Sequence, residues 1–176
     1  MVQSVELVLD DAADAAVRAQ WAALAEAGLP SQADHTSASN APHVTVGVAD
    51  AIEGAVEQEL EGAAAALPLP VQLGPLVLLG GHRVVLARMV VVTEELLSLH
   101  HHVSQAMAHC PGQSDYLRPG QWVPHVTLAA RLKPEMVSLA LEVLREHRPA
   151  PDEHATSAVG LRRWDSVARR TWIIGT

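Results

Sequence analysis

The tetrapeptide Pro-His-Val-Thr occurs twice in this chain, and the second copy, at 124–127, follows the first, at 42–45, by 82 residues. Each copy opens an apolar run typical of a buried strand, "HVTVGV" in the first case and "HVTLAA" in the second. A loop of fourteen residues leads to each copy, 29–42 and 111–124. The matched spacing indicates an internal duplication, which restricts the fold to two similar units.

The first half of the chain alternates between expected strands and helices. A strand at 5–9 leads to a helix at 11–27, in which apolar residues recur at helical spacing. After the first tetrapeptide strand we expect a second helix, with Asp50 as N-cap and Glu53 completing a capping box. The segment 67–81 then predicts two short strands around a Gly-Pro turn.

The second half repeats this order. A strand at 87–91 leads to a helix at 93–110, where Thr93 is the expected N-cap and matches Asp11 of the first helix. A further helix starts near Pro134, with Val137, Ala140, Leu141 and Leu144 facing inward, and two strands at 155–163 and 167–175 follow it. Each half is therefore a strand-helix-strand-helix-strand-strand unit.

These units predict an α+β fold formed by one domain over residues 1–176. We expect two pseudo-symmetric lobes, at about 1–82 and about 83–176, with mainly antiparallel sheets around a central cleft. Approximate two-fold symmetry would place the two tetrapeptide strands side by side across that cleft.

Each tetrapeptide strand carries a histidine and a threonine on one face, because residues i and i+2 of a strand point the same way. His43 and Thr45 form the first pair, and His125 and Thr127 form the second. Around one ligand, one imidazole could act as a general base and the other as a general acid. The threonine hydroxyls could then bind the nonbridging oxygens of a phosphodiester. This chemistry requires no metal and no cofactor.

Two His-x-Thr motifs in a duplicated chain of this size resemble the 2H phosphoesterase superfamily. The resemblance is to its bacterial 2′-5′ RNA ligase-like proteins, also called RNA 2′,3′-cyclic phosphodiesterases, and it covers essentially the whole chain. It implies that His43 and His125 are catalytic and that Thr45 and Thr127 bind phosphate. It also implies hydrolysis of a 2′,3′-cyclic phosphate to a 2′-phosphomonoester, and weak reversible joining of RNA ends through a 2′-5′ bond.

Four further residues are candidates for substrate binding. Tyr116, Arg118 and Trp122 precede the second motif, and Arg131 follows it. An aromatic ring can stack on a base and a guanidinium can pair with a phosphate, although these side chains could equally serve to hold the loop in place. The histidines at 100–102 point about 100° apart on a helix, so we interpret them as a helix surface and not as a metal site.

Composition limits the partners. Twelve Lys and Arg against twenty Asp and Glu give a formal charge of −8, the wrong sign for binding a long polyanion. We therefore expect a small cyclic-phosphate nucleotide or a short RNA end as the partner, and no membrane, because no apolar run approaches ~18 residues. Cys110 is the only cysteine and the first residues lack a secretion signal, which favours a cytoplasmic protein. The sequence does not fix the oligomeric state, and a monomer is the expectation.

Two alternatives of other classes stay open. The first is a catalytically silent protein that keeps the cleft and binds nucleotides or phosphorylated metabolites. The second is a metalloprotein with His43 and His125 as ligands, which is disfavoured because no Asp, Glu or Cys accompanies either motif at ligand spacing. The sequence does not assign the acid and base roles to particular histidines.

Overall fold

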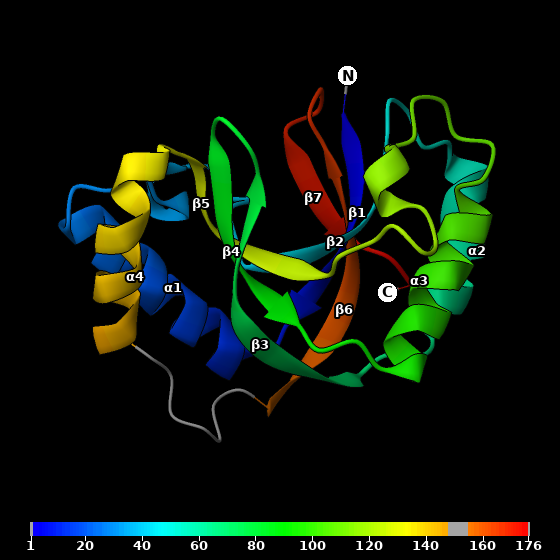
Figure 1. Ribbon diagram of the computed structural model, residues 1–176. Coiled ribbons are helices and arrows are strands. Elements are labelled where there is room, and N and C mark those ends of the chain that lie inside the picture. The colour runs from blue at the N-terminus through cyan, green and yellow to red at the C-terminus, as the bar shows by residue number, and fades with distance from the viewer. Residues whose placement is uncertain (1, 148–154, 176) are drawn as a thin grey trace.

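The structure is a computed structural model in which residues 2–147 and 155–175 are described. Its described part contains four α-helices, seven strands and three short 3₁₀ turns (Figure 1). In chain order they are β1 (Gln3–Leu9), α1 (Asp11–Glu26), η1 (Gln32–Asp34), β2 (His43–Ala49), α2 (Gly54–Ala64), β3 (Leu69–Gly80), β4 (Val84–Val90), α3 (Glu94–Ala106), η2 (Asp115–Leu117), β5 (His125–Leu132), η3 (Pro134–Met136), α4 (Val137–Glu146), β6 (Ala155–Asp165) and β7 (Arg170–Ile173).

The strands form one sheet in the order β2-β1-β6-β3-β4-β5, and β7 pairs with β6. All of its pairings are antiparallel, so the predicted α+β class with antiparallel strands is confirmed. The two motif strands, β2 and β5, lie at the two edges of this order and also contact each other. The expected boundary near residue 82 falls in the β3–β4 turn, and the two-lobe division stays a prediction.

The helices form two pairs. Helix α1 packs with α4 and contacts β5, whereas α2 packs with α3, which contacts β2. Figure 1 shows the first pair at one end of the molecule and the second pair at the other, with the strands between them. Each pair combines one helix from each half of the sequence. None of the described helices has the length and apolarity needed to cross a membrane.

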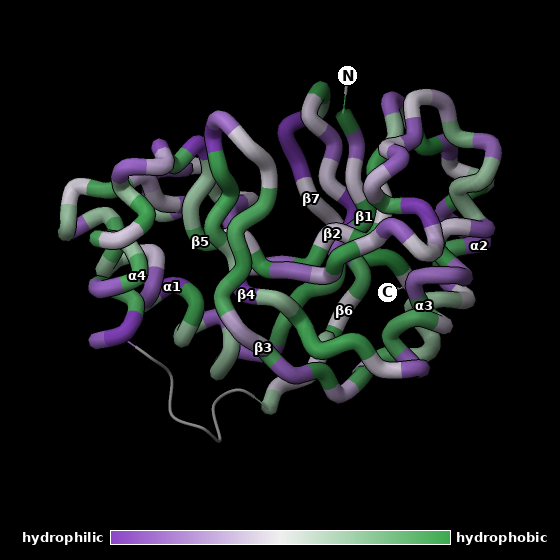
Figure 2. The backbone as a smooth tube through the Cα atoms, viewed as in Figure 1, coloured by the Kyte–Doolittle hydropathy of each residue, from purple (hydrophilic) through white to green (hydrophobic). Residues whose placement is uncertain are grey.

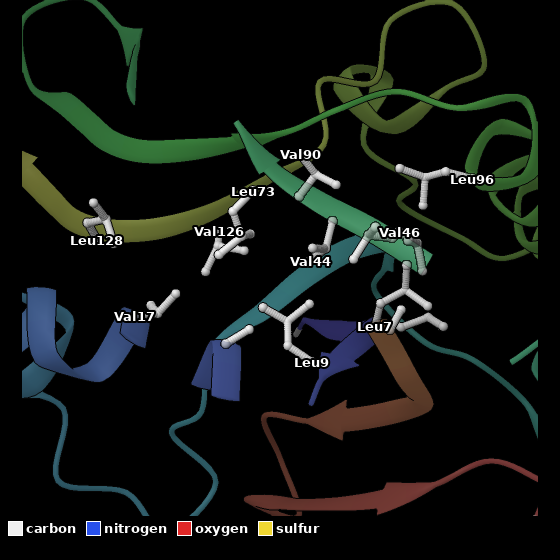
Figure 3. Packing of buried hydrophobic residues seen from close by; sticks show 14 of the residues in the cluster. Leu7, Leu9, Val17, Val44, Val46, Leu73, Val90, Leu96, Val126 and Leu128 are labelled. Carbon is white, nitrogen blue, oxygen red and sulfur yellow. The ribbon is translucent and has the colours of Figure 1, made fainter. Parts of the chain in front are cut away.

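Side chains of the motif strands alternate between the core and the surface. Val44 and Val126 are 2% and 1% exposed, and Figure 3 shows them among the packed core residues. The histidine and threonine on either side of each valine are only partly buried. This alternation is the one predicted from the tetrapeptide, and it directs the polar pair of each motif away from the core.

Helix α2 begins differently from its prediction. Its N-cap is Glu53 with no side-chain capping bond, so the predicted capping box of Asp50 and Glu53 is wrong. The preceding residues bond to distant segments instead. The Ile52 N–H donates to Gln3 Oε1 at 2.6 Å, and the Asp50 N–H donates to the Pro111 carbonyl at 2.8 Å. These tertiary bonds hold Asp50 and Ile52 outside the helix, which begins at Gly54.

Two other local predictions differ from the structure. The two short strands expected at 67–81 are one strand, β3, whose register shifts between Leu73 and Leu76 and so accommodates the Gly-Pro pair. Helix α1 begins at Asp11, as predicted, and its N-cap is Asp10. Leu141 is 41% exposed, whereas Val137, Ala140 and Leu144 of the same predicted face are partly or fully buried, so Leu141 lies at the edge of that face.

Gly47 in β2 lies directly against α3. A Cβ built at this position would meet Met107 Sδ at a distance that real Cβ atoms do not show. Met107 is 2% exposed and is the C-cap of α3. The side chain of Met107 thus occupies the space that a side chain at residue 47 would need.

Candidate active site

The two motif histidines have the same local geometry. His43 and His125 are the first residues of β2 and β5, and each Nδ1 lies 2.7 Å from the carbonyl oxygen two residues earlier, that of Ala41 and Val123 respectively. A carbonyl oxygen only accepts, so each Nδ1 carries the proton and donates it. Each Nε2 is thereby left as the atom that can exchange a proton with a ligand.

The two motif threonines are held through their main chains. Trp122 Nε1 donates to the Thr45 carbonyl at 3.0 Å, and Trp21 Nε1 donates to the Thr127 carbonyl at 2.9 Å. Both threonines lie on edge strands, where one row of carbonyl groups lacks a neighbouring strand. The indole groups supply donors there and fix the position of each motif.

Trp122 also stacks on a buried histidine. Its ring lies 4.0 Å from that of His100 at an angle of 7°, and His100 Nε2 donates to the Leu117 carbonyl at 2.9 Å. Burial lowers the pKa of His100, against the opposing effect of the Leu117 bond. The interpretation of residues 100–102 as a helix surface is therefore wrong for His100, although His101 and His102 are exposed.

A buried carboxylate lies beside the first histidine. Glu6 of β1 accepts from Arg162 Nε at 2.7 Å and from the Ser4 hydroxyl at 2.7 Å. Its Oε1 is 3.6 Å from His43 Nε2, which makes an ion pair when that imidazole is protonated. Arg162 Nη2 also lies 3.3 Å from His43 Nδ1. Because Nδ1 donates to Ala41, this approach is a contact and not a second hydrogen bond.

The second motif has no such carboxylate at the corresponding position. Glu6 is the cross-strand partner of Thr45, whereas the partner of Thr127 in β4 is Ala87. Sequence reasoning missed Glu6. The available signal was an acidic residue inside the apolar run "VELVL", since a buried acidic side chain in a strand needs a specific partner.

A pocket of about 730 Å³ opens beside the first motif. Its floor is the exposed face of β1, β2 and β6, and its walls come from the loop before β2 and the β6–β7 hairpin. Residues that line it include Glu6, His43, Thr45, Arg162, Trp164 and Arg169. The second motif lies on β5, the strand that contacts β2.

The other predicted substrate-binding residues lie outside this pocket. Tyr116 is 84% exposed in η2, a turn that contacts β2. Arg118 forms an ion pair with Asp115 at 2.7 Å. Arg131 is exposed in β5 and has a φ of 60°. Trp122 makes the stacking and hydrogen-bond contacts described above, which hold the motif strand, and the roles of all four in substrate binding stay predictions.

The described residues hold no group of three or more His, Cys, Asp or Glu side chains that could bind a metal ion. Cys110 is a free, partly buried thiol that packs against the core. Burial raises the pKa of this thiol, which keeps it in the protonated, unreactive form at neutral pH.

Two solved structures resemble this one in fold. Usb1 of Kluyveromyces marxianus, solved with uridine monophosphate, has a TM-score of 0.54 at 14% identity, over 98% of this chain and 97% of that chain. A structure described as a phosphoesterase has a TM-score of 0.56 at 17% identity, over 97% and 92%. A search of curated proteins gives no match.

The family model described as the 2′-5′ RNA ligase superfamily matches residues 9–168, a range that contains both tetrapeptides. The chain therefore belongs to the 2′-5′ RNA ligase superfamily of two-histidine phosphoesterases.

Proposed function

We propose that this protein is a metal-independent phosphodiesterase that hydrolyses 2′,3′-cyclic phosphate ends of RNA or of nucleotides. Membership of a phosphoesterase superfamily supports the phosphodiesterase chemistry. The observation that carries the proposal is the matched pair of histidines, each with Nδ1 bonded at 2.7 Å to a carbonyl, which leaves Nε2 as the atom that can exchange a proton. A general acid and a general base both need such an oriented imidazole.

In the proposed reaction, one neutral Nε2 accepts a proton from water as the water oxygen attacks phosphorus. The bond from phosphorus to the 3′ oxygen breaks, and the other histidine donates its Nε2 proton to that oxygen. The products are a 2′-phosphomonoester and a free 3′ hydroxyl. Thr45 and Thr127 donate hydrogen bonds to the nonbridging oxygens, and proton exchange with solvent restores both histidines.

The surroundings of the two histidines support different starting roles. The Glu6 carboxylate, 3.6 Å from His43 Nε2, can pair with the protonated imidazole, which makes His43 the general acid. His125 has Ala87 in the equivalent cross-strand row and acts as the general base. Replacement of water by the hydroxyl of a second RNA end would give the weak 2′-5′ joining activity by the same proton transfers.

The proposed ligand is a nucleotide or a short RNA end. The fold it shares with Usb1, a protein solved with uridine monophosphate, supports a site of nucleotide size. The formal charge of −8 argues against binding along a long RNA. A silent nucleotide-binding protein of the same fold is the alternative.

The test is hydrolysis of nucleoside 2′,3′-cyclic phosphates and of oligonucleotides with cyclic-phosphate ends, in excess EDTA, followed by phosphorus NMR. We expect 2′-phosphomonoesters to form at the same rate with and without the chelator. Activity that is lost on chelation and restored by zinc or manganese would establish a metalloenzyme instead. Binding of these nucleotides without any turnover would establish the silent alternative.

A further inference from the structure

The pocket beside the first motif contains groups that hydrolysis of a cyclic phosphate does not use. Trp164 lies on β6 two residues after Arg162, so both side chains point to the pocket face of the sheet. Arg169 lies in the turn between β6 and β7 and lines the pocket wall that this hairpin forms. The second motif pair does not line this pocket, so the pocket extends to one side of the reaction centre.

The backbone at Arg169 is strained. Its φ is 52°, in the left-handed region that costs a residue with a Cβ roughly 1–2 kcal/mol and that glycine adopts freely. The turn around it is ordered, because Asp165 Oδ1 accepts from the N–H groups of Val167 at 2.7 Å and Ala168 at 3.0 Å. Backbone strain of this kind clusters at ligand-binding sites, and Arg169 also lines the pocket, so its guanidinium is a candidate for binding the ligand.

The charge of Arg169 is not balanced within the pocket. Glu6, the pocket's carboxylate, forms its ion pair with Arg162 at 2.7 Å. Across residues 2–147 and 155–175, no carboxylate lies within ion-pair distance of Arg169. In a protein with a net charge of −8, a free cation at a pocket wall attracts an anionic group of the ligand to that point.

Trp164 offers a flat apolar surface in the same pocket. Among the described side chains, no aromatic ring and no cation stacks on its ring, in contrast to Trp122, which stacks on His100, and Trp172, which lies under Arg163 and Arg170. Nucleobases stack on such rings without regard to sequence. The pocket volume of about 730 Å³ falls within the range of roughly 300–1,000 Å³ for small-molecule sites.

We propose that this pocket binds the nucleoside that carries the cyclic phosphate, with its base on Trp164 and its 5′-phosphate paired with Arg169. The preferred substrate is then a nucleotide with two phosphates, a 2′,3′-cyclic phosphate and a 5′-phosphate or phosphodiester, as at the end of an RNA. A free nucleoside 2′,3′-cyclic phosphate lacks the group that Arg169 binds. This inference rests on the proposed function for the position of the cyclic phosphate.

The test measures binding without turnover, by calorimetry with adenosine 2′-monophosphate and adenosine 2′,5′-bisphosphate. We expect the wild type to bind the bisphosphate about tenfold or more tightly than the monophosphate, as one charged hydrogen-bonded pair would give. In Arg169→Gln the ratio of the two affinities should fall to near one. Arg170→Gln is the matched control, because Arg170 lies 4.9 Å over the Trp172 ring and does not line the pocket. It should keep the wild-type ratio.

Two further variants separate binding from folding. Arg169→Gly removes the guanidinium, so the ratio of the two affinities should fall to near one. Because it also relieves the left-handed strain, it should unfold at the same temperature as the wild type or a higher one. Trp164→Ala should weaken both ligands about tenfold, the usual effect of losing one base stack, and keep their ratio. Equal affinities of the wild type for the two ligands, or a ratio that persists in Arg169→Gln, would overturn the inference.

The hydrolysis assay fails or succeeds separately. If the wild type turns over no cyclic phosphate but still prefers the bisphosphate, the proposed hydrolysis is refuted and the proposed nucleotide binding in the pocket is supported. Turnover of cyclic phosphates with no preference for a 5′-phosphate would support the hydrolysis and refute the pocket.

Discussion

The two motifs hold their histidines in the same way, but the sheet faces beside them differ. Next to the first motif, the strands present polar and charged side chains together with one indole: Ser4, Glu6, Arg162 and Trp164. Next to the second motif, the same rows present apolar side chains: Val77, Leu79, Val85, Ala87 and Met89. In Figure 2 the β3–β4 hairpin is largely green, whereas the β6–β7 hairpin is mostly purple to pale. The orientation of the two histidines is therefore shared between the halves, and in our proposal ligand recognition belongs to the first of them.

The largest effect should test the shared part of this comparison. His43→Ala or His125→Ala should each lower kcat/KM for a cyclic phosphate by roughly 10²–10⁴-fold, the usual contribution of general acid–base catalysis. The double variant should be little worse than the more damaged single variant, because the pair acts as a unit. Initial rates measure this, with circular dichroism to check the fold. Near wild-type rates in either single variant would show that the two motifs are not equivalent.

The next effect concerns the carboxylate that only the first motif has. Glu6→Ala should lower the free energy of unfolding by about 3–5 kcal/mol, because it leaves the buried Arg162 guanidinium without its partner. The double variant Glu6→Leu/Arg162→Met removes both charges and should recover most of that loss. Urea denaturation measures both. An unchanged unfolding midpoint in Glu6→Ala would mean that this ion pair does not support the first motif.

A smaller effect tests how the two edge strands are held. Trp21→Phe and Trp122→Phe each remove the N–H that bonds a motif threonine carbonyl, and each should cost about 1–3 kcal/mol of unfolding free energy. Similar losses in the two variants would show that both motif strands depend equally on an indole donor. A loss in one variant alone would mean that solvent satisfies the other carbonyl. Urea denaturation of the two single variants distinguishes these results.

The smallest effect is a pH dependence of stability that comes from His100, which α3 packs against the loop before the second motif. Burial lowers the pKa of His100 below its ordinary value of 6.5, so the unfolded chain binds this proton more readily than the folded chain. His100 therefore costs no stability well above that value. The free energy of unfolding falls as the pH drops below it towards the folded-state pKa. His100→Gln should lose less thermal stability than the wild type between about pH 7.5 and about pH 5.5. His101→Gln, at the exposed neighbouring position, should behave as the wild type.

Features set by local pattern were predictable from the sequence. Both motif strands, the Thr93 N-cap and the buried face of α1 follow from spacing and capping chemistry, and the structure has each of them. The duplication also singled out both histidines as candidates, because each copy supports the interpretation of the other, and their catalytic role stays a prediction. The antiparallel α+β class followed from the same order of elements.

Features set by distant contacts were not predictable. Glu6 and Arg162 are 156 residues apart in the chain, so their ion pair has no local signal. The burial of His100 depends on a stack with Trp122 from a separate loop. Nothing in the local sequence distinguishes His100 from the two histidines that follow it. The predicted capping box at Asp50 is wrong for the same reason. The distant Gln3 side chain of β1 accepts a hydrogen bond from the Ile52 N–H and holds this segment outside the helix.

The contact between Gly47 and Met107 sets the order in which substitutions can accumulate. A side chain at residue 47 would force the buried Met107 into another rotamer, and overpacking of this kind costs about 1–3 kcal/mol. A shorter residue at 107 frees that volume first, and alanine at 47 then fits. The two positions are therefore epistatic: the same change at residue 47 is harmful or tolerated according to what already stands 60 positions further along the chain.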